Sequence, residues 1–265
     1  PILLMDGIAG LRGWQWLFVL QALPTIALGL CFRFALPEGP SAAPWLPQSE
    51  KAWLVAQLDS ERQHRESVQR FSVAGALTNG TVWLIALAGV GINAAAYGLI
   101  LFLPQMIHQL GVSAAMTPLV NAVPFAAAAV AMALWSIRSD RRRERNWHAA
   151  IPAAISGLGL VACAVLRDPV AIMVALTLGI SGVFCYVAVF WAVPSAMLSG
   201  PAAAAGLALI NAVSNLGSFV GPYMVGWVRQ VTGNYSLAIM ALGLGPLAAS
   251  IVAASLRSAR KFEQD

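Results

Sequence analysis

Charged residues are scarce in this sequence. Only 10% of the 265 residues are Asp, Glu, Lys or Arg, whereas 59% are hydrophobic, and the mean hydropathy is +0.74. A soluble domain carries roughly 25% charged residues, because its surface must face water. A bilayer accepts apolar side chains directly. The composition therefore excludes an ordinary soluble domain and predicts a membrane protein.

Cysteine and histidine are also rare, with three of each. Cys31, Cys163 and Cys185 lie in apolar runs, and none has the spacing of a metal site. The histidines are scattered, and His148, beside a basic loop, is expected at a surface or interface. No apolar stretch combines His with Glu or Asp, as an intramembrane enzyme would require. We therefore expect no enzyme, with no catalytic residue, metal site or cofactor.

Seven apolar stretches are each long enough to cross a bilayer, which takes about 20 apolar residues. They cover residues 14–36, 76–107, 117–137, 147–166, 170–198, 202–228 and 236–256. Short clusters of Gly, Pro or Asn, which end helices, separate most of them. The predicted fold class is an all-α membrane protein with seven transmembrane helices.

One connection, residues 37–75, is long and polar. It contains a predicted short amphipathic helix, with Ser49 as its N-cap and with Trp53, Leu54 and Leu58 on its apolar side. We expect a linker at the membrane surface; docking of a partner is the alternative. The chain then divides into a loop and one helix (1–36), the linker (37–75), a six-helix bundle (76–257) and a tail (258–265).

The basic residues are distributed unequally between the two sides of the predicted bundle. Of the 16 Lys and Arg, only Arg12, Arg167 and Arg229 lie opposite the linker. The positive-inside rule then places the linker and the C-terminus in the cytoplasm and the protein in the cell (inner) membrane. The net charge of +5 is explained by topology, and we expect no nucleic-acid partner. Because the chain begins at Pro1 and its first span runs inward, we expect a truncated protein lacking a preceding six-helix half.

Three segments resemble one transporter family. They are GLRGWQWLF at 10–18, the linker motifs LPEGP, APWL and EKAWL at 36–40, 43–46 and 50–54, and GLALINAVSNLGSFVGPY at 206–223. They are similar to the anion:cation symporter family of the major facilitator superfamily. The resemblance implies that superfamily's fold, here its C-terminal six-helix bundle plus one preceding helix.

The same resemblance implies secondary active transport of small organic anions, such as sugar acids or other carboxylates, by alternating access. The expected coupling ion is H⁺, and the bilayer is the other expected partner. Two alternatives stay open: a superfamily carrier of another substrate class, such as a sugar or drug, and a non-transporting fragment or scaffold.

Uncharged polar side chains within the apolar stretches are the candidate substrate contacts, because the last six stretches contain no Asp, Glu, Lys or Arg. Such groups are costly in lipid unless they are satisfied, so they should face the bundle interior. The candidate substrate-cavity residues are Tyr97, Asn211, Asn215, Asn93, Ser214, Tyr186 and Trp191. Hydrogen bonding between helices is the alternative role. The resemblance favours the cavity for Tyr97, Asn211 and Asn215, because the family's seventh and eleventh helices line it.

A polar run, Ser139-Asp140-Arg141-Arg142-Arg143-Glu144-Arg145, resembles the superfamily's cytoplasmic loop motif. The motif has Asp-Arg followed by Gly and further Arg, and this copy has Ser136 and Arg143 at two glycine positions. We expect Asp140, Arg141 and Arg145 to form a cytoplasmic latch, in which the carboxylate meets an Arg or a helix N-terminus. A basic loop that only sets topology is the alternative.

Overall fold

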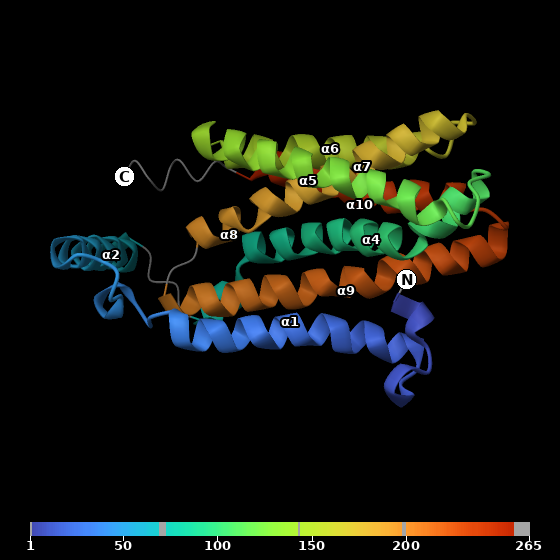
Figure 1. Ribbon diagram of the computed structural model, residues 1–265. Coiled ribbons are helices and arrows are strands. Elements are labelled where there is room, and N and C mark those ends of the chain that lie inside the picture. The colour runs from blue at the N-terminus through green and yellow to red at the C-terminus, as the bar shows by residue number, and fades with distance from the viewer. Residues whose placement is uncertain (1, 69–72, 143, 198–199, 257–265) are drawn as a thin grey trace. The chain divides into compact units, whose positions relative to one another are not determined.

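The computed structural model describes residues 2–68, 73–142, 144–197 and 200–256, and within them the regular elements are all helices (Figure 1). The chain divides into two compact units, residues 1–68 and 69–265. The boundary falls inside the linker expected at 37–75. Residues 69–72 of that linker, Arg143 of the loop motif and the expected tail at 258–265 lie outside the described residues.

The first unit contains one apolar helix and one polar helix. Its elements are η1 (Ile2–Met5), η2 (Ile8–Gly10), α1 (Gly13–Ala35), η3 (Pro40–Ala42) and α2 (Gln48–Val68). The loop before α1 is fixed to it by the Gly13 amide, which donates to Asp6 Oδ1 at 2.6 Å. The polar helix is longer than expected and begins at Gln48, so Ser49 does not cap it. Its second half is rich in Glu, Gln and Arg, which are strong helix formers.

The second unit is a bundle of six long helices and two short ones among its described residues. They are α3 (Val73–Thr78), α4 (Gly80–Gln109), α5 (Thr117–Arg142), α6 (Arg145–Ala162), α7 (Pro169–Phe190), α8 (Ala192–Met197), α9 (Gly200–Thr232) and α10 (Ser236–Ser255). α4 packs against α9 and α10, α10 against α6, and α7 against both α6 and α5.

Each of the seven expected spans coincides with a helix. Six described helices are long and apolar enough to cross a membrane, among them α1. The seventh, α6, has only 18 residues, and its first turn contains Arg145, Asn146 and His148. The span expected at 76–107 is divided, because Asn79 caps α4: its Oδ1 accepts from the amides of Thr81 (2.8 Å) and Val82 (3.3 Å).

Glycines allow α4 and α9 to approach closely. A Cβ on Gly217 would overlap the Val90 carbonyl oxygen, and one on Gly221 would overlap the Ala94 carbonyl oxygen. Successive contacts advance in the same direction along both helices, so α4 and α9 run parallel and side by side (Figure 1). Small residues play this part in membrane bundles, where backbone proximity supplies much of the packing energy.

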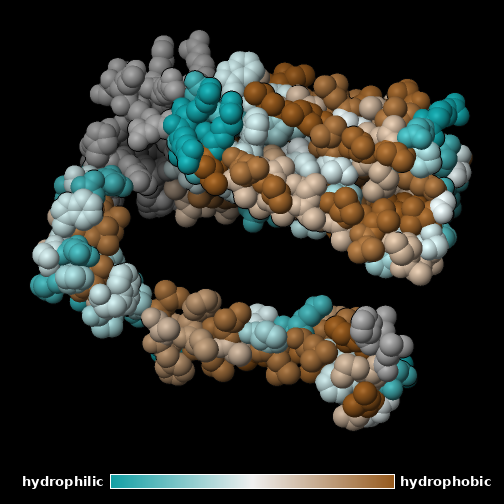
Figure 2. Space-filling model, turned by 45° about the horizontal axis from the view of Figure 1, so that its top comes forward, coloured by the Kyte–Doolittle hydropathy of each residue, from teal (hydrophilic) through white to brown (hydrophobic). Residues whose placement is uncertain are grey.

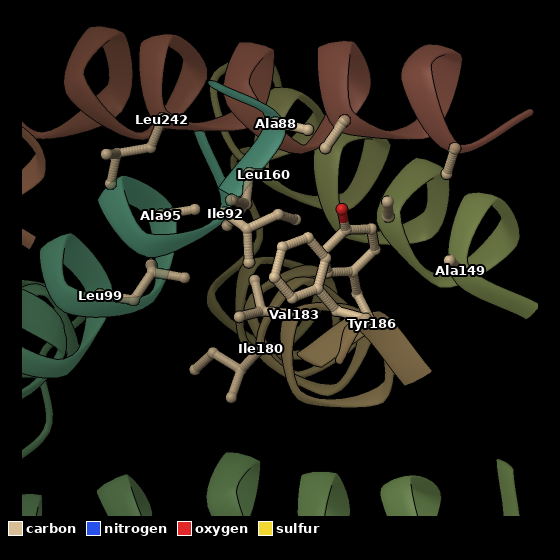
Figure 3. Packing of buried hydrophobic residues seen from close by; sticks show 14 of the residues in the cluster. Ala88, Ile92, Ala95, Leu99, Ala149, Leu160, Ile180, Val183, Tyr186 and Leu242 are labelled. Carbon is tan, nitrogen blue, oxygen red and sulfur yellow. The ribbon is translucent and has the colours of Figure 1, made fainter. Parts of the chain in front are cut away.

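The bundle has an apolar core and an apolar exterior. Ile92 and Leu99 of α4 pack in the core with residues of α6, α7 and α10, such as Ile180 (Figure 3). Leu134 and Ile251, however, are 65% and 71% exposed. Brown, hydrophobic surface follows the length of the helices in Figure 2, and teal, polar surface is concentrated near helix ends. Such an exterior fits lipid or further helices rather than water.

Candidate functional site

A row of polar and aromatic side chains runs along one exposed face of α9. Asn211, Asn215, Phe219 and Tyr223 are four residues apart in succession, and all four are exposed. Asn215 Nδ2 donates to Asn211 Oδ1 at 3.0 Å and to the Asn211 carbonyl at 2.9 Å. The rings of Phe219 and Tyr223 stack, with centroids 5.9 Å apart and planes 17° apart. The row therefore offers amide groups at one end and an aromatic surface at the other.

The α4 candidate Tyr97 is also exposed, on the helix next to α9. It is 43% exposed. Because Gly221 of α9 lies against Ala94 of the parallel helix α4, Tyr97 is at about the same level along the bundle as Tyr223. We call these exposed residues of α4 and α9 the α4–α9 polar face: Tyr97, Asn211, Asn215, Phe219 and Tyr223. Its phenols and amides are neutral hydrogen-bonding groups.

Asn93 and Ser214 lie between the two helices rather than on that face. Asn93 Nδ2 donates to the Ser214 carbonyl at 2.9 Å, and Ser214 Oγ donates to the Ala86 carbonyl at 3.2 Å. Ser214 is 3% exposed. These hydrogen bonds connect α4 to α9, which is the helix-joining role weighed for both residues.

Tyr186 in α7 and Trp191 at its C-cap both contact the ring of Phe190. Tyr186 is 3% exposed and stacks on Phe190 at 5.4 Å, within the core shown in Figure 3. Trp191 meets the same ring edge-on at 5.1 Å and is partly exposed. The two side chains are therefore neighbours of one ring, and Tyr186 is enclosed by other helices.

The three residues of the expected latch behave differently. Asp140 and Arg141 are exposed at the end of α5, while Arg145 Nη1 donates to the Ala192 carbonyl at 3.0 Å and so joins the start of α6 to α8. His148, expected at a surface or interface, is buried. The Trp135 indole on α5 donates to the His148 carbonyl at 2.7 Å and covers the imidazole ring.

The asparagine candidates were found from their polarity, but their aromatic continuation was missed. Phe219 and Tyr223 lie on the same four-residue period as Asn211 and Asn215, and that period is the signal that would have identified them. Also missed was a contact at the far end of α9. Tyr235 OH donates to Gln105 Oε1 at 2.7 Å, and the Arg229 guanidinium lies 4.9 Å from the Tyr235 ring centre. No group of three or more His, Cys, Asp or Glu positioned for a metal occurs in the part of the chain that the structure describes.

Comparison with known proteins identifies the class to which this bundle and its polar face belong. Residues 2–222 match the model of the Major Facilitator Superfamily. The chain belongs to this family, and it is a multi-pass membrane protein of the transporter class, not an enzyme.

Several curated relatives are similar over most of this chain. A "Putative tartrate transporter" of Agrobacterium vitis is 40% identical over 232 residues, which are 88% of this chain and 51% of the relative. The "Inner membrane transport protein RhmT" of Escherichia coli is 35% identical over 96% of this chain and 58% of its own length. A "Quinolone resistance transporter" of Acinetobacter baumannii is 34% identical over 91% and 56%. The chain spans about half the length of the curated relatives it matches.

Proposed function

We propose that this chain is part of a secondary active transporter of small organic anions, such as sugar acids or other carboxylates, driven by H⁺ symport. The observation that carries the proposal is the 40% identity, over 88% of the chain, to a protein named as a tartrate transporter. The resemblance of residues 206–223 to the anion:cation symporter family supports the same substrate class. That run contains most of the α4–α9 polar face.

The chemistry of the α4–α9 polar face suits such a solute. Amide and phenol groups donate to and accept from hydroxyl and carboxylate oxygens. They are neutral, so the face can orient a polyhydroxy acid without holding it too tightly for release. The negative charge needs a cation, and coupling needs a titratable group. No Asp, Glu, Lys or Arg is present in the last six apolar stretches, so we propose that both functions act from outside them.

Alternating access requires this bundle to move against a partner surface. We propose that the α4–α9 polar face is the wall of the substrate cavity on this side. We also propose that Asp140 and Arg141 act as a latch at the cytoplasmic end in one transport state. With the basic side facing the cytoplasm, the protein lies in the inner membrane with the linker and C-terminus inside.

A second candidate function is transport of a larger aromatic drug. The 34% identity to a protein named as a quinolone resistance transporter favours it, as does the stacked Phe219–Tyr223 pair, which offers an aromatic surface.

Uptake measurements separate these functions. Cells expressing the protein from its complete reading frame should accumulate labelled tartrate or another sugar acid faster at pH 5.5 than at pH 7.5, because protons drive entry. Uptake that does not change with pH would reject proton symport. Failure of every carboxylate tested, combined with lower quinolone accumulation in the same cells, would favour the drug carrier.

A further inference from the structure

A groove lies between α5 and α6, with α7 as its floor. α5 packs chiefly on α7 and barely on α6, which leaves the groove open on one side. Its walls include Leu134 on α5, Ile155 on α6 and Leu178 on α7, and these three side chains are 65%, 41% and 49% exposed. The groove is separate from the α4–α9 polar face, because none of the residues of that face lines it.

Three arginines line one end of the groove. Arg138, Arg141 and Arg142 are three and four residues apart, so they share one face of α5. The same face continues into the groove through Leu134 and Ala131. In the described part of the chain, none of these three guanidinium groups takes part in an ion pair. The groove thus has three guanidinium groups at one end and apolar walls along the rest.

The length of the groove matches half of a bilayer. From Ala131 to Arg142 the helix advances roughly 16 Å at 1.5 Å per residue. The hydrocarbon core of a bilayer is about 30 Å thick, so one leaflet accounts for about 15 Å. With the arginines at the headgroup level, the apolar part of the groove, from Arg138 to Ala131, advances roughly 10 Å and so covers about two-thirds of the hydrocarbon depth of one leaflet. This fit does not depend on which side of the membrane the arginines face.

We propose that this groove binds one anionic phospholipid, such as phosphatidylglycerol. The phosphate accepts hydrogen bonds from Arg138, Arg141 and Arg142, and one acyl chain lies against Leu134, Ile155 and Leu178. A guanidinium forms bidentate hydrogen bonds with phosphate oxygens, and basic clusters next to transmembrane helices attract anionic lipids. A zwitterionic lipid fits the apolar walls equally well but its headgroup adds a positive charge beside the arginines. The groove therefore discriminates by headgroup charge.

Native mass spectrometry of the delipidated protein in detergent tests this proposal. Phosphatidylglycerol, phosphatidylcholine or inorganic phosphate is added, and bound mass is counted. We expect one phosphatidylglycerol to bind at least fivefold more tightly than phosphatidylcholine. Each of Arg138→Gln, Arg141→Gln and Arg142→Gln should weaken it roughly fivefold, as one basic residue near an anionic surface does. Size-exclusion chromatography checks that each variant is folded.

Two further variants separate the contributions of the groove. Leu178→Trp fills the apolar part and keeps all three arginines, so it should weaken phosphatidylglycerol binding severalfold. Arg167→Gln removes one exposed arginine that does not line the groove, so it should leave the affinity for phosphatidylglycerol unchanged. Equal binding of the two lipids, or an equal effect of Arg167→Gln, would overturn the proposal. Inorganic phosphate that competes at similar concentration would assign the arginines to free phosphate and overturn it as well.

Discussion

The side-chain amide of Asn215 donates a hydrogen bond to Oδ1 of Asn211, one turn earlier on the exposed face of α9, across 3.0 Å. The same Nδ2 also reaches the Asn211 carbonyl. This pairing leaves the side-chain Nδ2 of Asn211 and the side-chain Oδ1 of Asn215 for a solute. The two residues therefore present one donor and one acceptor in a fixed relation, and they should act as a unit.

Replacement of either asparagine by alanine should weaken substrate affinity. Loss of one hydrogen bond of about 0.5–1.5 kcal/mol corresponds to a rise in KM of roughly two- to twelvefold. The double variant should cost less than the sum of Asn211→Ala and Asn215→Ala, because each removes the partner that orients the other. Uptake kinetics give the KM of the two single variants and of the double variant. Gln230→Ala, at the exposed end of α9, is the control, and an unchanged KM in Asn211→Ala would remove that residue from the site.

Asn93→Ala should affect stability rather than affinity. It removes the hydrogen bond to the Ser214 carbonyl that connects α4 to α9. Hydrogen bonds between membrane helices contribute on average about 0.6 kcal/mol and at most about 1.7 kcal/mol. We expect a lower melting temperature in detergent and a KM within twofold of the unchanged protein. A KM that rises as far as in Asn211→Ala would place Asn93 in contact with substrate.

The close crossing of α4 and α9 should not tolerate a methyl group. In Gly217→Ala and Gly221→Ala the new Cβ would overlap the backbone oxygens of Val90 and Ala94, which cannot move aside as a side chain can. Overpacking costs about 1–3 kcal/mol, so both variants should unfold at lower temperature. Gly226→Ala, on the same helix, is the matched control, because its Cβ would meet only Phe102 Cζ at 3.7 Å. Equal melting temperatures for the three variants would contradict this packing.

Local signals in the sequence were enough to predict the helices. Apolar runs of 20 residues or more leave no alternative in a bilayer, and all seven coincide with helices. The division of the apolar run at 76–107 into two helices was harder to foresee. Asn79 breaks an apolar run by capping α4, and a single polar residue within such a run does not reveal whether its side chain turns back to the backbone.

Placement of the polar residues depended on which helices pack together. Asn93 and Tyr97 share a spacing of four, yet Asn93 lies against α9 while Tyr97 is exposed. The spacing of residues in the sequence shows which of them share one face of a helix. Which neighbouring helix covers part of that face depends on contacts between residues distant in sequence. His148 is a second example, because it is covered by Trp135, which lies on the preceding helix.

Tyr235 should make the protein sensitive to alkaline pH. Burial raises the pKa of its phenol, and the nearby Arg229 opposes that rise only in part. The folded protein therefore holds the phenolic proton more tightly than the unfolded chain, whose tyrosines ionise near pH ~10. The resulting stability is fully present below about pH 10 and is lost as pH rises through the higher folded pKa.

Tyr235→Phe should lower the free energy of unfolding at pH 7 by about 0.5–1.5 kcal/mol, because the hydrogen bond to Gln105 is lost. It should also reduce the further loss above pH ~10. Thermal unfolding from pH 7 to 11 measures both effects, and Tyr223→Phe, at an exposed tyrosine, is the control. If Tyr223→Phe reduced the loss of stability above pH ~10 equally, Tyr235 would not be the source of the alkaline sensitivity.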